Sequence, residues 1–229
     1  MSYFDDAKTS LGSDFEYSGL PIVYKVWNEL RFDEDNEKKF FRSFVRGFKN
    51  RPSVRISNSP STIPDPLVMM LLNARIKGLS MLDFELIKVG HRVSMTVENV
   101  VGLILEEYIH EKLISYGWSA CWGSCIKAVD FCSYEGSLIQ VKNKSNTENS
   151  SSNKIRVGTD IKKWYRFNAS NGESNWKELN KIVGNDICLS EEEFQSFAIE
   201  LVKNNPSVIG VSQNDTSFLN SFDTRVSLG

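Results

Sequence analysis

Asp130, Gln140 and Lys142 bring a carboxylate, an amide and an amine into a short stretch with strand-like alternation. The turn-forming pair Glu135-Gly136 separates Asp130 from the other two residues. Residues two apart on a strand point to the same face, so Gln140 and Lys142 are expected to share a face. A hairpin through the turn would bring Asp130 beside that face. The spacing therefore predicts one cluster of three polar groups.

This cluster has the groups that metal-assisted phosphodiester hydrolysis needs. The carboxylate of Asp130, the amide oxygen of Gln140 and the carbonyl of Val141 are hard oxygen ligands that suit a divalent cation. The ammonium group of Lys142 can orient a water molecule and offset charge that develops on phosphate. The three residue types are common, and a surface hairpin with ordinary polar residues is the alternative interpretation.

A further acid is expected from the helix predicted over residues 96–115, which comes directly before the first predicted strand. Glu98, Gly102 and Glu106 recur every four residues and lie on one side of that helix, whereas Glu107 points elsewhere. We expect Glu106 to be the second acid of the site, with Glu98 as the alternative.

The remaining elements place this cluster in an α/β chain. Residues 1–20 are expected to be loosely ordered, and a short helix is expected to end at Gly90. The strands and helices follow from alternation, apolar periodicity and capping residues. Strands are predicted over 118–122, 124–132, 137–143 and 207–211, and helices over 20–48 with one interruption, from 66 to 74, and over 80–89, 96–115, 175–183 and 190–204.

The order of helix, hairpin and basic polar stretch resembles the core of the PD-(D/E)XK nucleases. Four stretches carry a closer resemblance to the SinI-type restriction endonucleases, over roughly residues 96–183: ENVVG with EEYI at 98–109, KAVD at 127–130, QVKNKSNTENSSSN at 140–153 and IKKWYR at 161–166. The superfamily usually has an acid where this chain has Gln140. An amide offers an oxygen without charge, and Glu106 or Glu98 could supply the charge.

The resemblance implies a restriction-endonuclease-like core, a central mixed β-sheet flanked by helices, with an additional N-terminal helical region. It also implies a type II enzyme that uses Mg²⁺ to cut double-stranded DNA at GGWCC. A homodimer suits a palindromic site, because each subunit reads one half. The same resemblance implies a partner methyltransferase that acts on the same site.

The charge distribution agrees with a DNA partner, although the whole chain has a formal net charge of −2. Residues 137–181 hold nine lysines and arginines against four acids, a net charge of +5, whereas residues 185–229 hold two against seven, −5. Amide, hydroxyl and basic side chains read base edges and bind phosphates. The candidates for DNA contact are Asn143, Lys144, Asn146, Asn149, Ser150, Ser151, Ser152, Asn153, Lys154, Arg156, Lys162, Lys163 and Arg166.

Composition excludes other classes. The chain has 229 residues, with 41% hydrophobic and 24% charged residues, as is usual for a globular protein. It holds no apolar run long enough to span a membrane, and its N-terminal residues do not resemble a secretory signal, so we expect a cytoplasmic protein with reduced cysteines. We expect an N-terminal helical region over 1–95 that supports DNA binding or dimerisation, and a nuclease core over 96–229 with a DNA-recognition segment at 143–181; a single domain is the alternative.

Two other functions are compatible with the same residues. The first is another PD-(D/E)XK nuclease, either modification-dependent or a repair enzyme. The second is a non-catalytic DNA-binding protein in which Gln140 marks a decayed site.

Overall fold

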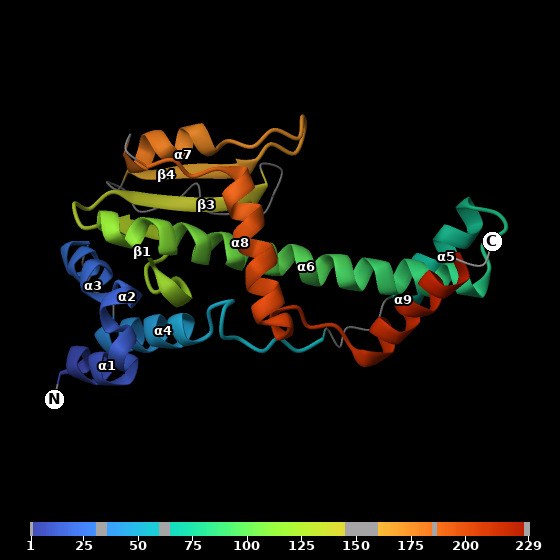
Figure 1. Ribbon diagram of the computed structural model, residues 1–229, viewed down its shortest axis with the longest axis horizontal. Coiled ribbons are helices and arrows are strands. Elements are labelled where there is room, and N and C mark those ends of the chain that lie inside the picture. The colour runs from blue at the N-terminus through green and yellow to red at the C-terminus, as the bar shows by residue number, and fades with distance from the viewer. Residues whose placement is uncertain (1, 31–35, 60–64, 145–159, 185–186, 227–229) are drawn as a thin grey trace.

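The computed structural model describes residues 2–30, 36–59, 65–144, 160–184 and 187–226. The predicted α/β class is confirmed, with helices around one small sheet (Figure 1). The helices are α1 (Tyr3–Leu11), α2 (Phe15–Ser18), α3 (Leu20–Glu29), α4 (Glu37–Lys49), α5 (Pro66–Arg75), α6 (Met81–Leu113), α7 (Trp176–Val183), α8 (Glu191–Asn204) and α9 (Gln213–Val226).

The sheet is mixed and has four strands in the order β1-β2-β3-β4. Strands β1 (Trp118–Ala120) and β2 (Phe131–Ser133) are antiparallel, and β2 is antiparallel to β3 (Leu138–Lys144). Strand β4 (Ile161–Phe167) is parallel to β3. This topology agrees with the predicted mixed sheet of a restriction-endonuclease-like fold, and it places β3 between two hydrogen-bonded neighbours.

Helix α6 is the longest element and joins the two ends of the molecule. Its 33 residues span about 50 Å at about 1.5 Å per residue. Its C-terminal half packs against β1 and β3, and its N-terminal half extends away from the sheet (Figure 1). The prediction of a separate helix that ends at Gly90 is wrong, because one interior glycine costs a helix only about 1 kcal/mol.

The N-terminal region is ordered, and the prediction of a loose lead-in over residues 1–20 is wrong. Ser2 and Asp5 form a reciprocal capping box that starts α1. Helices α1 to α4 then pack beside the sheet end of α6, and their apolar residues join one buried cluster that extends from Ala7 to Val208. The predicted boundary between residues 95 and 96 falls inside α6, so of the two domain descriptions we propose the single domain.

The segment before β2 differs from the predicted strand over 124–132. Ser124 and Ala128 have φ angles of 53° and 61°, in the left-handed region, which breaks the extended conformation. The alternation of residue types there reflects turns packed on the core rather than a strand. The predicted strand over 207–211 is also wrong, because Pro206 starts a 3₁₀ turn over Pro206–Val208.

The C-terminal helices follow the capping signals. The hydroxyl of Ser190 accepts a hydrogen bond from the backbone N–H of Glu193, and α8 starts directly after it. Helix α9, which the sequence did not predict, lies with α5 beside the end of α6 that is remote from the sheet (Figure 1). Among the described residues, none of the helices is both long and apolar enough to cross a membrane.

Candidate active site

Asp130 lies directly before β2 and is held by the backbone on both sides. Its N–H donates to the carbonyl of Ile139 at 2.9 Å, and its carbonyl accepts from the N–H of Cys121 at 2.8 Å. Its side chain is fixed as well, because Oδ2 accepts a hydrogen bond from the backbone N–H of Val141 at 2.8 Å. The hairpin therefore locks this carboxylate against the middle of β3, as the sequence spacing predicts.

Strand β3 carries the other two predicted groups. Gln140 and Lys142 are two residues apart on a regular strand, so their side chains leave the same face. The charge of Lys142 acts on Asp130 and on Glu106, which shows that its ammonium group lies near both carboxylates. The described structure thus brings a lysine and two acids together from β3, α6 and the start of β2.

Gln140 has an unusual environment for an amide. The residue is 5% exposed, and within the described part of the chain its Oε1 atom is buried without a hydrogen-bond partner. A buried oxygen without a hydrogen bond lowers the free energy of unfolding by about 1–3 kcal/mol. Such a group in a native protein therefore indicates a ligand or a catalytic role. A hydrogen-bond donor or a metal cation bound to this oxygen would remove that loss of stability.

Glu106 is the acid that α6 contributes to this cluster. Its pKa is raised to about 8, mainly by burial and also by the neighbouring charge of Asp130, while Lys142 opposes the rise. Burial also raises the pKa of Asp130, against the opposing effects of the Val141 N–H and Lys142. Both carboxylates therefore lack sufficient positive charge around them, which is the electrostatic state of a site prepared for a cation.

Glu98 and Glu107, two other acids of α6 that were compared with Glu106 from the sequence, lie away from this cluster. Glu98 forms an ion pair with Lys144 at 3.1 Å, and its side chain is 53% exposed. Glu107 is buried on another side of the helix, where it accepts hydrogen bonds from the backbone N–H and hydroxyl of Ser53 and pairs with Arg51. Glu106, the preferred helix acid, is thus the one that meets Asp130.

The donor set fits a divalent cation. Within the described residues no group of three or more His, Cys, Asp or Glu side chains gathers as a metal site, so a cation would rely on two carboxylates and neutral oxygens. Asp130 and Glu106 supply the charge, and the unbonded Oε1 of Gln140 supplies a neutral oxygen. Oxygen ligands of this kind suit Mg²⁺.

Apart from Lys144, which pairs with Glu98, the predicted DNA-contact residues divide into three groups. Those from Asn146 to Arg156 lie outside the described residues. Lys162 is exposed on β4, and Lys163 is partly exposed beside it. Arg166 instead makes contacts within the protein, because it donates to Asn143 Oδ1 at 2.9 Å and pairs with Glu191 at the start of α8.

His110 and Trp164, which could in principle take part in catalysis or base stacking, instead pack in the core. His110 is fully buried, contacts the Tyr17 carbonyl through Nε2 at 2.7 Å and accepts from the Ala120 N–H, and burial lowers its pKa to about 4. Trp164 is fully buried against Trp176 and donates to the carbonyl of Asn175. The four cysteines carry free thiols.

The contacts of Glu191 were not predicted from the sequence. Glu191 accepts from Arg166 and from the indole N–H of Trp176, and so it joins β4, α7 and α8. Its position in an acidic helix start gave no signal for this role, since such acids usually face solvent.

Comparison with known proteins identifies the family. The family model described as SinI restriction endonuclease matches residues 34–204. The chain belongs to the SinI restriction endonuclease family. The type II restriction enzyme Eco47I of Escherichia coli is 40% identical over 187 residues, which cover 80% of this chain and 78% of that protein. The type II restriction enzyme SinI of Salmonella infantis is 44% identical over 143 residues, 60% of this chain and 61% of that protein's length.

Family membership confirms the enzyme class predicted from the sequence, a type II restriction endonuclease that cleaves double-stranded DNA at specific sites. Members of this class generally need a divalent metal ion. The family match covers α6, the hairpin and β4, which are the elements that carry the cluster of Glu106, Asp130, Gln140 and Lys142.

Proposed function

We propose that this cluster hydrolyses DNA phosphodiester bonds with Mg²⁺, and that the target is GGWCC. The observation that carries the proposal is the meeting of Glu106, Asp130 and Lys142 beside a buried amide oxygen of Gln140 that has no partner among the described residues. The target sequence rests on the resemblance to SinI-type enzymes.

Each residue has a distinct role in this proposal. Asp130 and Glu106 would hold the cation, together with Oε1 of Gln140 and the carbonyl of Val141. A bound Mg²⁺ polarises the phosphate and lowers the pKa of water. Lys142 orients the attacking water and offsets negative charge on the phosphate. The hydrogen bond from the Val141 N–H keeps one oxygen of Asp130 in place and leaves the other to bind a ligand.

DNA would lie along the basic stretch that follows β3. The contact candidates are those from Asn143 to Arg156 with Lys162, Lys163 and Arg166. Arg166 and Asn143 would act mainly by holding the base of this stretch, given their bonds to each other and to Glu191. We further propose a homodimer with one active site for each strand, and a methyltransferase that protects the same site in the host.

A plasmid digest tests the reaction. We expect a plasmid with one GGWCC site to be linearised with Mg²⁺, to stay intact with EDTA, and to resist cleavage once the site is methylated. End mapping should place every cut at that site. Cleavage of methylated plasmid alone would instead select a modification-dependent nuclease, and binding without cleavage would select the non-catalytic alternative.

Variants test the residues. Asp130→Ala and Lys142→Ala should each reduce cleavage at least about 100-fold while leaving most of the DNA affinity, because each removes charge used in the reaction. Lys203→Ala is the matched control, because this lysine is exposed on α8. The variant should cleave DNA like the native protein. Cleavage by Asp130→Ala at the native rate would refute the assignment.

A further inference from the structure

The end of the molecule remote from the sheet has an unusual surface. We call α5 (Pro66–Arg75), residues 76–95 and α9 (Gln213–Val226) the helical arm (Figure 1). Ten of the sixteen large exposed hydrophobic residues in the described structure lie between residues 67 and 95. They are Leu67, Val68, Met70, Leu71, Ile76, Met81, Leu82, Leu86, Ile87 and Met95, with exposed fractions from 39% at Ile87 to 77% at Met81.

Helix α5 has the composition of a buried helix without its burial. Its sequence PLVMMLLNAR is almost entirely apolar, yet the described structure buries none of its ten residues. A helix this short is marginal in water and normally owes its stability to a packed apolar face. In the first fifteen residues of α6, Val89 is the one that the described structure buries. These helices are therefore expected to pack against a further molecule.

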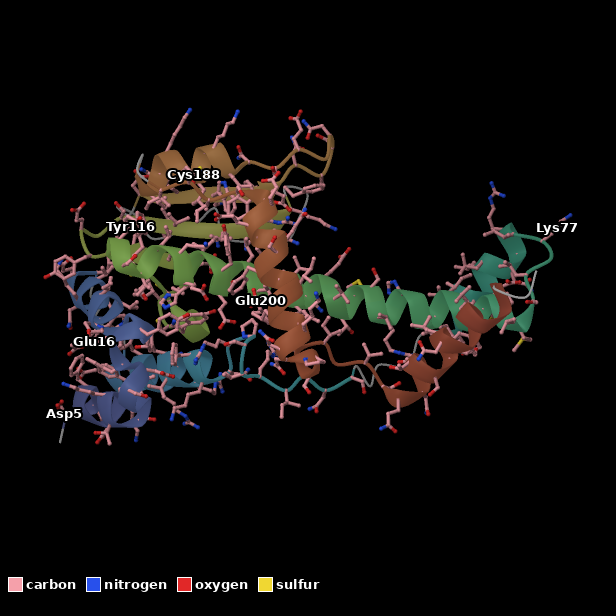
Figure 2. All side chains as sticks on the ribbon, viewed as in Figure 1. Asp5, Glu16, Lys77, Tyr116, Cys188 and Glu200 are labelled. Atoms are coloured by element: carbon pink, nitrogen blue, oxygen red, sulfur yellow. The ribbon has the colours of Figure 1, made fainter. Side chains whose placement is uncertain are left out.

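The charges of the helical arm do not suit DNA or another strongly charged partner. Residues 66–95 hold four lysines and arginines against two acids, a net charge of +2. Glu85 pairs with Lys88 at 2.7 Å, and Arg92 pairs with Asp215 of α9. Lys77 lies at the tip of the helical arm (Figure 2). A phosphate-binding surface would carry many basic side chains that are not paired in this way.

The amount of apolar surface fits a protein interface. Ten Leu, Ile, Val and Met side chains at about half exposure present on the order of 1,000 Å², against about 800 Å² that each partner buries in a standard stable interface. In a twofold dimer the same surface meets itself, and an apolar helix pair with a low net charge can do so without strong repulsion between like charges.

We propose that the helical arm is the surface through which two copies of this chain pair, α5 and the N-terminal half of α6 of one copy packing against the same helices of the other. This surface would form the interface of the proposed homodimer. Its expected effect on DNA cleavage rests on the proposed function. In each copy the sheet lies at the end of α6 that is remote from the helical arm, so pairing through the arms would leave both sheets accessible to DNA.

Analytical ultracentrifugation of the full chain tests the surface. We expect the native protein to sediment at about twice 26.0 kDa at micromolar concentration. The double variant Met70→Glu and Met81→Glu places two charges on the helical arm and should raise the dimer dissociation constant at least 100-fold. Ile56→Glu is the matched control, because Ile56 is 79% exposed outside the helical arm, and it should leave the dimer intact.

A second measurement uses only the native protein, so misfolding of a variant cannot affect it. Hydrogen exchange of the native protein, compared between dilute and concentrated samples, should show added protection on dimerisation confined to the helical arm. A native protein that stays monomeric with and without DNA would overturn the proposal, as would a double variant that still dimerises or protection that appears elsewhere. Flotation of the monomer with lipid vesicles would overturn it in favour of a membrane surface.

The cleavage assay separates this proposal from the proposed function. The double variant should nick a one-site plasmid rather than linearise it at limiting concentration, whereas Asp130→Ala should dimerise normally and not cut. If the native protein dimerises through the helical arm but cuts no DNA, the interface stands and the proposed function fails. If it cuts DNA while the helical arm plays no part in dimerisation, the reverse holds.

Discussion

The two halves of α6 show how one helix serves two environments. From residue 96 to Leu113 its apolar side chains are packed against the sheet and the N-terminal helices, and this half supplies Glu106 to the proposed active site. From Met81 to Met95 similar side chains are exposed in the helical arm. The sheet end of the molecule, which we call the body (α1 to α4, residues 96–113 of α6, the sheet, α7 and α8), is stabilised by its own core, whereas the helical arm has the composition of an interface. Apolar content therefore does not distinguish a core helix from an interface helix, but burial does.

A pair of leucines on α6 provides the largest test of this contrast. Leu105→Ala should lower the free energy of unfolding by about 2–5 kcal/mol, because it leaves a cavity at a fully buried position. Leu82→Ala, at a side chain that is 42% exposed, should cost less than about 1 kcal/mol in dilute protein. Urea unfolding measures both. Equal costs in dilute protein would contradict the contrast.

Replacing Gln140 tests whether its buried amide oxygen lowers the free energy of unfolding while it serves cleavage. Gln140→Leu keeps the volume and removes the buried oxygen, so the free energy of unfolding should rise by about 1 kcal/mol while cleavage falls at least about 100-fold. Gln195→Leu, at an exposed position on α8, is the control and should change both by little. Loss of both stability and cleavage would mean that the amide has a structural role instead.

Two glycines provide a test with opposite signs. A Cβ at Gly47 of α4 would lie 2.2 Å from the backbone nitrogen of Gly123, so Gly47→Ala should destabilise the body by about 1–3 kcal/mol. A Cβ at Gly90 meets no described atom within 4 Å, so Gly90→Ala should stabilise α6 by about 0.5–1 kcal/mol. Thermal unfolding compares them. Destabilisation by Gly90→Ala would show that a partner packs closely at this position.

The pH dependence of stability reports the half-buried Glu106. The pKa of Glu106 is about 8 in the folded chain against an ordinary value of 4.5, so the folded state keeps a proton that the unfolded state releases. Between these values the wild type should lose stability as the pH rises. Glu106→Gln should remove this loss, so its advantage in urea unfolding without divalent ions should grow from pH 5 to pH 8. A constant difference across this range would contradict the burial of this acid.

Local sequence patterns determined much of the site. Strand alternation places Gln140 and Lys142 on one face, the turn at Glu135-Gly136 returns the chain toward Asp130, and helical spacing separates Glu106 from Glu107. These relations hold because each depends on the period of one element or on one tight turn. The capping signal at Ser190 predicted the start of α8 for the same reason.

The tertiary structure decided what depends on distant contacts. The choice of Glu106 over Glu98 depends on which segments meet α6, and no local pattern records this. The bonds of Arg166 to Asn143 and Glu191 likewise join residues far apart in the chain. The exposure of the apolar arm could not be predicted either, since the sequence shows which side chains avoid water but not which surfaces cover them.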